Sequence, residues 1–286
     1  MDRSLFAEAG VRLRLAQSLF GFSCLKYRDS DGFIASTKQS GNHWIRHLLG
    51  TVIARRYELP EQAHIGETRL VGKPQSRRVH AGIPRIVQSH KVCSPLVHNV
   101  AFRRVLRFPR YVILVRDLRA ILVSHYERWK DIYQVPFSDY LRGGRRGKRF
   151  DYDLWDAIAF LNSWSSMQRR IPDLATVLRY EDMQVDAARE AERVWRFLGL
   201  PDVASSEFRA AAEASTKDRM KAKEPGAAKT GTIIRLNARN PENWYAPADR
   251  EFFIAACARH LQHDFGYDYS RFESALPDAR SIPAAA

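Results

Sequence analysis

STKQSGNHWIRHLL, residues 36–49, has the pattern of a β-strand that continues through a short polar turn into an α-helix. The run FIAST (33–37) is typical of a strand, and from Trp44 onward apolar residues recur at every fourth position, as on one face of a helix. The turn contains one glycine, Gly41, and lacks the Lys-Ser/Thr pair that ends a nucleoside-triphosphate P-loop. A strand–turn–helix unit of this kind is typical of parallel α/β sheets.

Three further β-rich runs follow along the chain: RIVQS (85–89), YVILVR (111–116) and ATVLRYED (175–182). The second of these is almost entirely apolar, as expected for a strand that is buried on both faces of a sheet. Helical patterns lie at 119–129 and 190–200. The alternation of strands and helices predicts an α/β fold in which a parallel sheet with flanking helices forms three layers.

The chain has 286 residues, enough for one large domain, and we predict that residues 1–286 form a single domain. Residues 1–30 mix charges into apolar positions and are expected to form a helical extension, either packed on the domain or in contact with a membrane surface or a partner. They lack the continuous apolar segment of a secretory signal. Residues 274–286 are expected to be a disordered tail.

The composition narrows the class of partner. A formal net charge of +14 predicts attraction to anions such as nucleotides, nucleic acid, anionic lipid or acidic glycans. No basic stripe with interleaved aromatic residues is present, so a nucleic-acid partner is not expected. The three cysteines, Cys24, Cys93 and Cys257, are scattered, which argues against a disulfide framework and favours a reducing, cytoplasmic compartment.

A metal site is not expected either. His43 and His47 stand four residues apart in the predicted helix, but Trp44 occupies the position of the glutamate in the zinc-binding pattern H-E-x-x-H. No third ligand is evident, so the histidine spacing is interpreted as a coincidence of helix periodicity.

In parallel sheets ligands bind at the carboxyl ends of the strands, so the residues that follow each strand are the candidates for function. The turn after the first strand carries Ser40, Gly41 and Asn42 and leads into a helix, whose free N–H groups and positive dipole end form an anion site. The alternative is a plain helix capped by serine. Tyr180, after the fourth strand, could stack on a base.

Two other strand ends carry ionisable side chains. His90 follows the second strand, where an imidazole is well placed to act as a general base, although a structural histidine is the alternative. Arg116 ends the third strand, and Ser124 lies two turns into the next helix. An arginine with a nearby hydroxyl suits a phosphate monoester, whereas an Arg–Asp surface pair with Asp117 is the alternative.

Taken together, these segments resemble the sulfotransferases that use 3′-phosphoadenosine 5′-phosphosulfate (PAPS), over residues 33 to 270. SGNHWIRHLL is similar to the family's 5′-phosphosulfate loop, and RDLRAILVS keeps the spacing of its 3′-phosphate motif between Arg116 and Ser124. QSH, with His90, is similar to the stretch that supplies the catalytic histidine, and Tyr180 belongs to a Y-E-D stretch. The resemblance implies a P-loop NTPase-like fold. The residues that it places in the cofactor site are Lys38, Gln39, Ser40, Gly41, Asn42, His43, Trp44, Arg116, Ser124, Tyr180, Lys229, Thr230 and Gly231.

The sequence departs from the family pattern at several positions. Gln39 stands where the loop carries a basic residue, with Lys38 one place earlier, and Gln88 replaces another lysine. Either Lys38 takes over the role or activity is reduced. Near the C-terminus the family's R-K-G-x-x-G-x-W pattern is represented by Lys229, Thr230 and Gly231 followed by a longer gap, and Arg235 or Arg239 is an alternative for its arginine.

The resemblance implies transfer of a sulfuryl group from PAPS to an acceptor hydroxyl, leaving 3′-phosphoadenosine 5′-phosphate (PAP). His90 is the implied general base, Lys38 assists catalysis, and no metal is needed. The basic stretch LRGGRRGKR (141–149) favours an anionic saccharide or lipid acceptor if it covers the substrate, the alternative being a plain surface loop. The aromatic residues Tyr126, Trp129 and Tyr133 instead favour a small alcohol with a flat or apolar body. We expect a monomer or a homodimer.

Two other functions are compatible with the sequence. A P-loop-type phosphotransferase would need a hydroxyl that binds magnesium directly after the loop lysine, and Gln39 follows Lys38 instead. A non-catalytic, basic polyanion-binding protein with a degenerate nucleotide site would fit the net charge and the two glutamines. Steep salt dependence without cofactor dependence would distinguish it.

Overall fold

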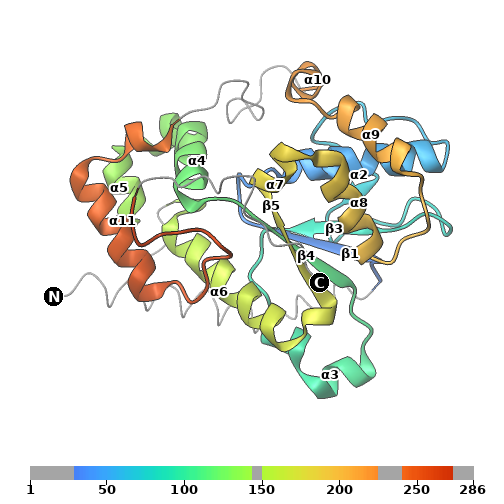
Figure 1. Cartoon of the computed structure of the whole chain (residues 1–286), viewed down its shortest axis with the longest axis horizontal. Helices are drawn as coiled ribbons and strands as arrows, with labels where there is room; N and C mark the ends of the chain where they lie inside the picture. The colour runs from blue at the N-terminus through green and yellow to red at the C-terminus, as the bar shows by residue number, and fades with distance from the viewer. Residues whose placement is uncertain (1–28, 144–149, 225–239, 273–286) are drawn as a thin grey trace.

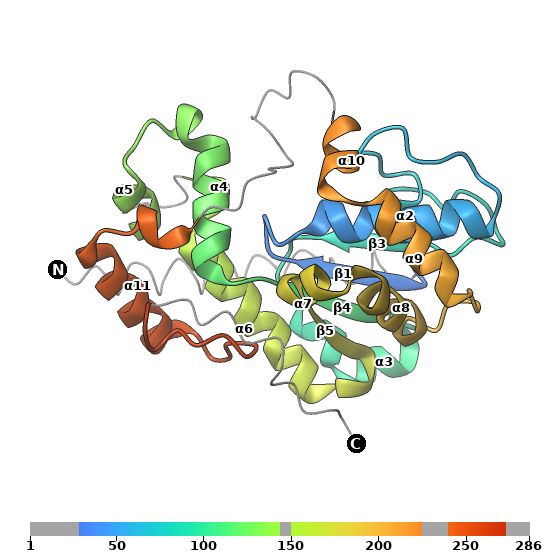
Figure 2. The same ribbon diagram turned by 45° about the horizontal axis from the view of Figure 1, so that its top comes forward.

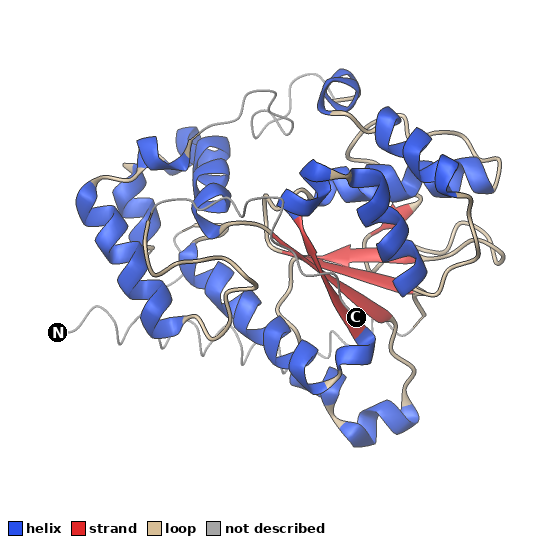
Figure 3. Cartoon of the chain, viewed as in Figure 1, coloured by secondary structure: helices blue, strands red, loops and turns tan. Residues whose placement is uncertain are grey.

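The computed structural model describes residues 29–143, 150–224 and 240–272. Within them, five strands form one parallel sheet in the order β2-β3-β1-β4-β5 (Figures 1 and 3). The strands are β1 (Gly32–Ser36), β2 (Val71–Gly72), β3 (Ile86–Ser89), β4 (Arg110–Val115) and β5 (Ala175–Arg179). The prediction of a three-layer parallel α/β sheet is confirmed.

Alternation along the strands sends side chains into two separate cores. Phe33 and Ala35 of β1 face one core, and Ile34 between them faces the other. On the first side lie α4 (Leu118–Tyr133), α6 (Leu154–Arg170) and α11 (Pro247–His260), and on the second lie α2 (Asn42–Arg56), α8 (Ala187–Phe197) and α9 (Ser205–Ala214). Figures 1 and 2 show α4, α5 (Phe137–Arg142) and α11 grouped apart from α2 and α9.

The remaining described helices are short. They are η2 (Pro95–His98), α3 (Val100–Val105), η3 (Pro172–Leu174), α7 (Tyr180–Val185), α10 (Lys217–Ala222) and η4 (Pro241–Trp244). In the described part of the chain, no helix combines the length and the apolar character that crossing a membrane would require.

Several predicted boundaries differ from the structure. The run ATVLRYED was expected to be β-rich to its end, but β5 ends at Arg179 and the next three residues begin α7. The short β2 was not predicted, because two residues carry no periodic pattern. The first residues of the basic stretch 141–149 belong to α5, and most of the rest lies outside the described residues. So do residues 1–28 of the predicted helical extension and the predicted tail.

Candidate active site

Four polar segments meet at the carboxyl edge of the sheet. The parallel register pairs Ala35 with Ser89, Ser36 with Leu114 and Val115 with Arg179, so the strands end almost level. The segments that follow them therefore emerge side by side, as the sequence predicted. They begin with Thr37, His90, Arg116 and Tyr180.

The turn after β1 is tightly folded. Gln39 and Gly41 have backbone φ angles of 61° and 91°, both in the left-handed region. The hydroxyl of Ser40 donates a hydrogen bond of 2.7 Å to the carbonyl of Thr37, so this side chain is fully buried inside the turn. Ser40 thus shapes the loop rather than presenting a free donor from its side chain.

The N-terminus of α2 is open. Gly41 precedes its first residue, Asn42, and no side chain caps the helix. The first turn contains no acidic residue. The first N–H groups of a helix have no partners within the helix, and they carry the positive end of its dipole. This end of α2 therefore offers a positive potential and several backbone N–H donors to a bound anion.

Two buried donors next to this helix end have no hydrogen-bond partner among the described residues: the hydroxyl of Thr37 and the indole N–H of Trp44. The amide oxygen of Asn42 is also buried without a partner. Buried polar groups are normally paired, and unpaired ones call for an explanation such as a missing ligand. Hydroxyl, indole and backbone donors at a positive helix end fit an anionic, oxygen-rich group such as a phosphosulfate.

Arg116 and Tyr180 form one wall of the site. The guanidinium of Arg116 lies 4.4 Å from the ring centroid of Tyr180 and donates a hydrogen bond of 3.0 Å to the carbonyl of Gln39. The Tyr180 ring makes an edge contact with Trp44 at 5.8 Å. The ring also lies against Gly41, where a Cβ atom would come within 2.5 Å of Tyr180 Cδ2. Glycine is thus needed at position 41 for both its backbone angle and its size.

His90 is oriented by the strand beside it. Its Nδ1 lies 2.8 Å from the carbonyl oxygen of Ser36 and 3.1 Å from the hydroxyl of the same residue. Because a carbonyl can only accept, Nδ1 carries the proton in this arrangement and Nε2 keeps its lone pair. Although His90 is exposed to solvent, partial desolvation lowers the pKa of its imidazole, and the cations Lys38 and Arg46 act in the same direction. The neutral, basic form is favoured.

Lys38 forms an ion pair with Asp151, which the sequence analysis did not identify as a site residue. The ammonium of Lys38 also lies 5.8 Å from the ring centroid of Tyr152. Asp151 is near enough to His90 to influence its titration. Lys38 is therefore held on the His90 side of the turn. No local pattern marks Asp151, since it lies 113 residues from its partner.

The two histidines of α2 are neutral. His43 Nδ1 lies 3.2 Å from the carbonyl of Ile65, and burial together with Arg46 lowers the pKa of its imidazole to about 4. His47 is fully enclosed with Ser215, at 2.8 Å between Nδ1 and the hydroxyl, and burial lowers its pKa to about 4 as well. Among the described residues, no group of three or more acidic, histidine or cysteine side chains could hold a metal ion.

The remaining predicted residues are placed only in part. Ser124 lies in the second turn of α4, on the helix that begins just after Arg116, and is half-buried. Lys229, Thr230 and Gly231 lie outside the described residues.

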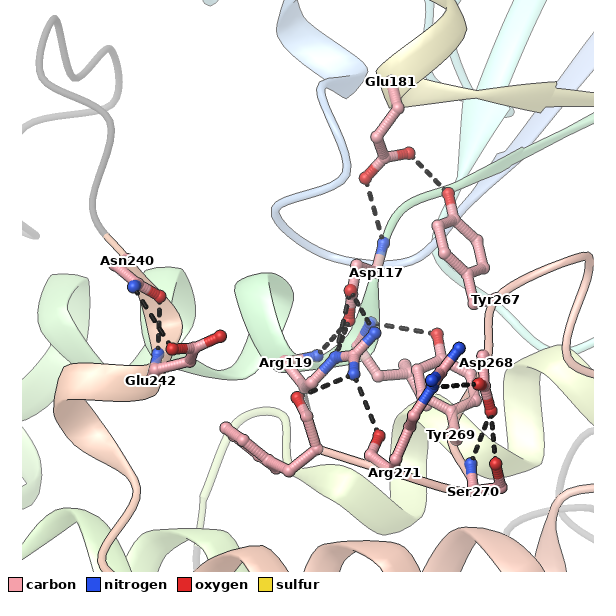
Figure 4. A network of polar contacts seen from close by, with 12 residues as sticks. Asp117, Arg119, Glu181, Asn240, Glu242, Tyr267, Asp268, Tyr269, Ser270 and Arg271 are labelled. Carbon is pink, nitrogen blue, oxygen red and sulfur yellow. Dashed lines mark hydrogen bonds and ion pairs between the residues drawn. The ribbon is translucent and has the colours of Figure 1, made fainter. Parts of the chain in front are cut away.

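The N-terminus of α4 differs from that of α2, because side chains accept from three consecutive N–H groups at its start. The Asp117 N–H donates to Glu181 Oε1 at 3.3 Å, and the Leu118 N–H donates to the Tyr269 hydroxyl at 3.1 Å. The Arg119 N–H donates to the Asp117 carboxylate at 2.8 Å. Asp117 thus caps α4, and its ion pair is formed with the buried Arg119 rather than with Arg116 (Figure 4). Of these two helix ends, the one at α2 is available to an anion.

Residues 29–240 match the family model described as the sulfotransferase domain. A flavonol sulfotransferase-like protein of Flaveria bidentis is 21% identical over 202 residues, which cover 65% of this chain and 63% of that protein. Carbohydrate sulfotransferase 1 of Danio rerio is 27% identical over 171 residues, or 55% of this chain and 38% of that protein. The chain therefore spans less than two thirds of the length of these curated relatives.

Solved structures show the same fold. A mouse sulfotransferase complexed with PAP superposes with a TM-score of 0.55 at 17% identity, covering 82% of this chain and 85% of that one. Retinol dehydratase, in complex with androsterone and PAP, superposes with a TM-score of 0.60 at 15% identity and covers 89% and 88% of the two chains.

Proposed function

The chain belongs to the sulfotransferase family, and from that premise we propose that it transfers a sulfuryl group from PAPS to an acceptor hydroxyl. The observation that carries the proposal is the uncapped N-terminus of α2, where the unpartnered donors of Thr37 and Trp44 lie beside Arg116 and His90. When bound, PAPS supplies the sulfuryl group and an adenosine bisphosphate leaving group.

Each part of the site has a distinct task in this proposal. The α2 N–H groups and the Thr37 hydroxyl hold the 5′ group of the donor and stabilise negative charge as it develops there. Arg116, together with Ser124, binds the 3′-phosphate, and the ring of Tyr180 contacts the adenine. Gln39 contributes its carbonyl, as the acceptor that orients Arg116.

His90 removes the proton of the acceptor hydroxyl through Nε2. The hydrogen bond from Nδ1 to the Ser36 carbonyl fixes the tautomer that leaves Nε2 free for this step. Lys38 is held on the same side by Asp151. Because the side chain of Gln39 is uncharged, Lys38 is the cation that balances the negative charge during transfer.

The acceptor that the site favours has a flat or apolar body. Trp129 and Tyr133 of α4 stack on each other, and the Tyr133 hydroxyl accepts a hydrogen bond of 3.1 Å from the Asp151 backbone N–H, which connects these rings to the Lys38 side of the site. Relatives named for flavonol and for carbohydrate substrates make a panel of phenols, small alcohols and sulfated saccharides the natural assay.

Calorimetric titration with PAP in EDTA, compared with ATP and magnesium, tests the proposal. We expect micromolar binding of PAP alone. Arg116→Ala should weaken it by roughly a hundredfold, because charge-assisted hydrogen bonds to phosphate are lost. His90→Ala should bind PAP normally and lower kcat by roughly a hundredfold or more.

Two outcomes would contradict the proposal. If the protein did not bind PAP and bound polyanions with steep salt dependence, it would be a basic binding protein with a degenerate nucleotide site. If ATP with magnesium bound and PAP did not, a phosphotransferase would be favoured. Normal turnover by His90→Ala would show only that another group is the base.

A further inference from the structure

Glu181 joins three segments that are far apart in the sequence. One carboxylate oxygen accepts the backbone N–H of Asp117 at 3.3 Å, and the other accepts the hydroxyl of Tyr267 at 2.5 Å. Figure 4 shows the carboxylate between these two groups. Glu181 is in the first turn of α7, Asp117 begins α4, and Tyr267 lies in the segment after α11.

The contact fixes the peptide that carries Arg116. Glu181 holds the backbone of Asp117, and the preceding residue, Tyr180, places its ring under the Arg116 guanidinium at 4.4 Å. Two consecutive residues of α7 thus position Arg116: Glu181 binds the peptide group that follows it, and Tyr180 contacts its guanidinium. Any shift of the start of α7 would move both contacts together.

Tyr267 is suited to holding Glu181 in place. Its hydroxyl is a donor to a carboxylate, and burial together with Glu181 raises the pKa of the phenol far above its ordinary value, so it stays protonated. On its other side, the guanidinium of Arg179 lies 4.6 Å from the Tyr267 ring centroid. A hydrogen bond between a phenol and a carboxylate is stronger than one between neutral groups, which restricts the rotation of the Glu181 side chain.

We propose that Tyr267, through Glu181, is a positioning residue for Arg116 and therefore sets the affinity for the adenosine bisphosphate part of the donor. This inference rests on the proposed function, because it assigns the Arg116 side chain to that ligand. Tyr267 lies in the segment after α11, outside the carboxyl edge of the sheet, and in this proposal it contacts neither the ligand nor the reacting atoms.

The segment does not depend on this hydroxyl for its attachment. Tyr269 accepts the Leu118 N–H, and Arg119 donates hydrogen bonds of 3.2 and 2.9 Å to the carbonyls of Arg271 and Phe272. The ring of Tyr269 also packs against Phe253 at 5.7 Å. Removal of the Tyr267 hydroxyl should therefore loosen Glu181 without detaching residues 264–272.

The test is calorimetric titration of the whole chain with PAP, for wild type, Tyr267→Phe and the control Tyr126→Phe. Tyr126 is also a buried tyrosine, but its hydroxyl donates to the Val135 carbonyl at 2.8 Å and not to a carboxylate. We expect Tyr267→Phe to raise the Kd for PAP by about tenfold, which corresponds to about 1.4 kcal/mol, while Tyr126→Phe leaves the Kd unchanged. The KM for PAPS should rise with it, and kcat at saturating PAPS should not fall.

Substitutions of Glu181 separate positioning from general stability. Glu181→Gln can still accept the Asp117 N–H and donate an amide hydrogen to the Tyr267 oxygen, so it should keep the Kd within about threefold. Glu181→Ala should raise it as much as Tyr267→Phe does. If both Glu181→Ala and Tyr267→Phe bound PAP like wild type, the inference would be wrong while the proposed function stood. If wild type itself did not bind PAP, the proposed function would have failed.

Discussion

Single residues decide the geometry of this site, and Gly41 is the clearest case. A left-handed backbone costs a residue with a Cβ atom roughly 1 kcal/mol, and at this position that atom would also come within 2.5 Å of Tyr180 Cδ2. Gly41→Ala should therefore displace Tyr180 and lower the free energy of unfolding by about 2 kcal/mol. PAP affinity should fall as well. Gly66→Ala, where a Cβ atom would meet only the His64 ring at 3.3 Å or more, is the control for urea denaturation. Equal unfolding midpoints for the two variants would contradict this account.

At the residue scale, the candidate site could be predicted from sequence where its residues lie at a strand end. His90, Arg116 and Tyr180 were identified as candidates because each lies at or just after the end of a predicted strand. Asp151 and Tyr267 were not identified, because their partners are distant in the sequence. Asp151 lies 113 residues from Lys38, and Tyr267 lies 86 residues from Glu181. No periodicity or turn chemistry links positions so far apart, so only the packed chain brings them together.

At the scale of elements, the start of α4 depends on a buried ion pair. Arg119 is 2% exposed and binds both oxygens of Asp117. Removing one partner leaves a charge buried without compensation, which costs about 3–5 kcal/mol. Arg119→Met should therefore lower the free energy of unfolding by that amount, whereas Arg196→Met, which breaks an exposed pair with Glu192, should cost less than about 1 kcal/mol. Urea unfolding followed by circular dichroism measures both values. An Arg119→Met variant as stable as Arg196→Met would show that the pair is not needed.

The elements themselves were predicted well where hydrophobic patterns are long. The helix at Asn42–Arg56 and the strand at Arg110–Val115 were found within a few residues of their bounds. The end of β5 was not predicted, because the tyrosine and the acidic residues after Arg179 give no signal for a change from strand to helix. The contact of Glu181 with the start of α4 then stabilises α7 from outside its own sequence.

Across the whole molecule, stability depends on keeping two histidines of α2 neutral. His43 and His47 have pKa values near 4 in the folded protein, against an ordinary value of 6.5. Burial is the main cause for both, and Lys223 lowers the pKa of His47 further. The unfolded chain therefore binds more protons between pH 6.5 and 4. Stability is complete above pH 6.5 and is lost as the pH falls through this window.

We expect the free energy of unfolding at pH 5 to be lower than at pH 7.5 by about 2 kcal/mol for the fully buried His47, and by somewhat less for His43. Replacement of His47 by glutamine removes its titration, so the loss of stability over the same interval should be about 2 kcal/mol smaller in His47→Gln than in wild type. The variant starts from a lower stability because the hydrogen bond to Ser215 is altered. His260→Gln is the matched control, because this half-buried histidine lies at the last residue of α11, away from α2. Urea unfolding at the two pH values gives all three differences. If wild type and His47→Gln lost the same free energy of unfolding between pH 7.5 and 5, a group other than His47 would be responsible.

Saturating PAP should raise every unfolding midpoint by mass action, since the ligand binds only the folded chain.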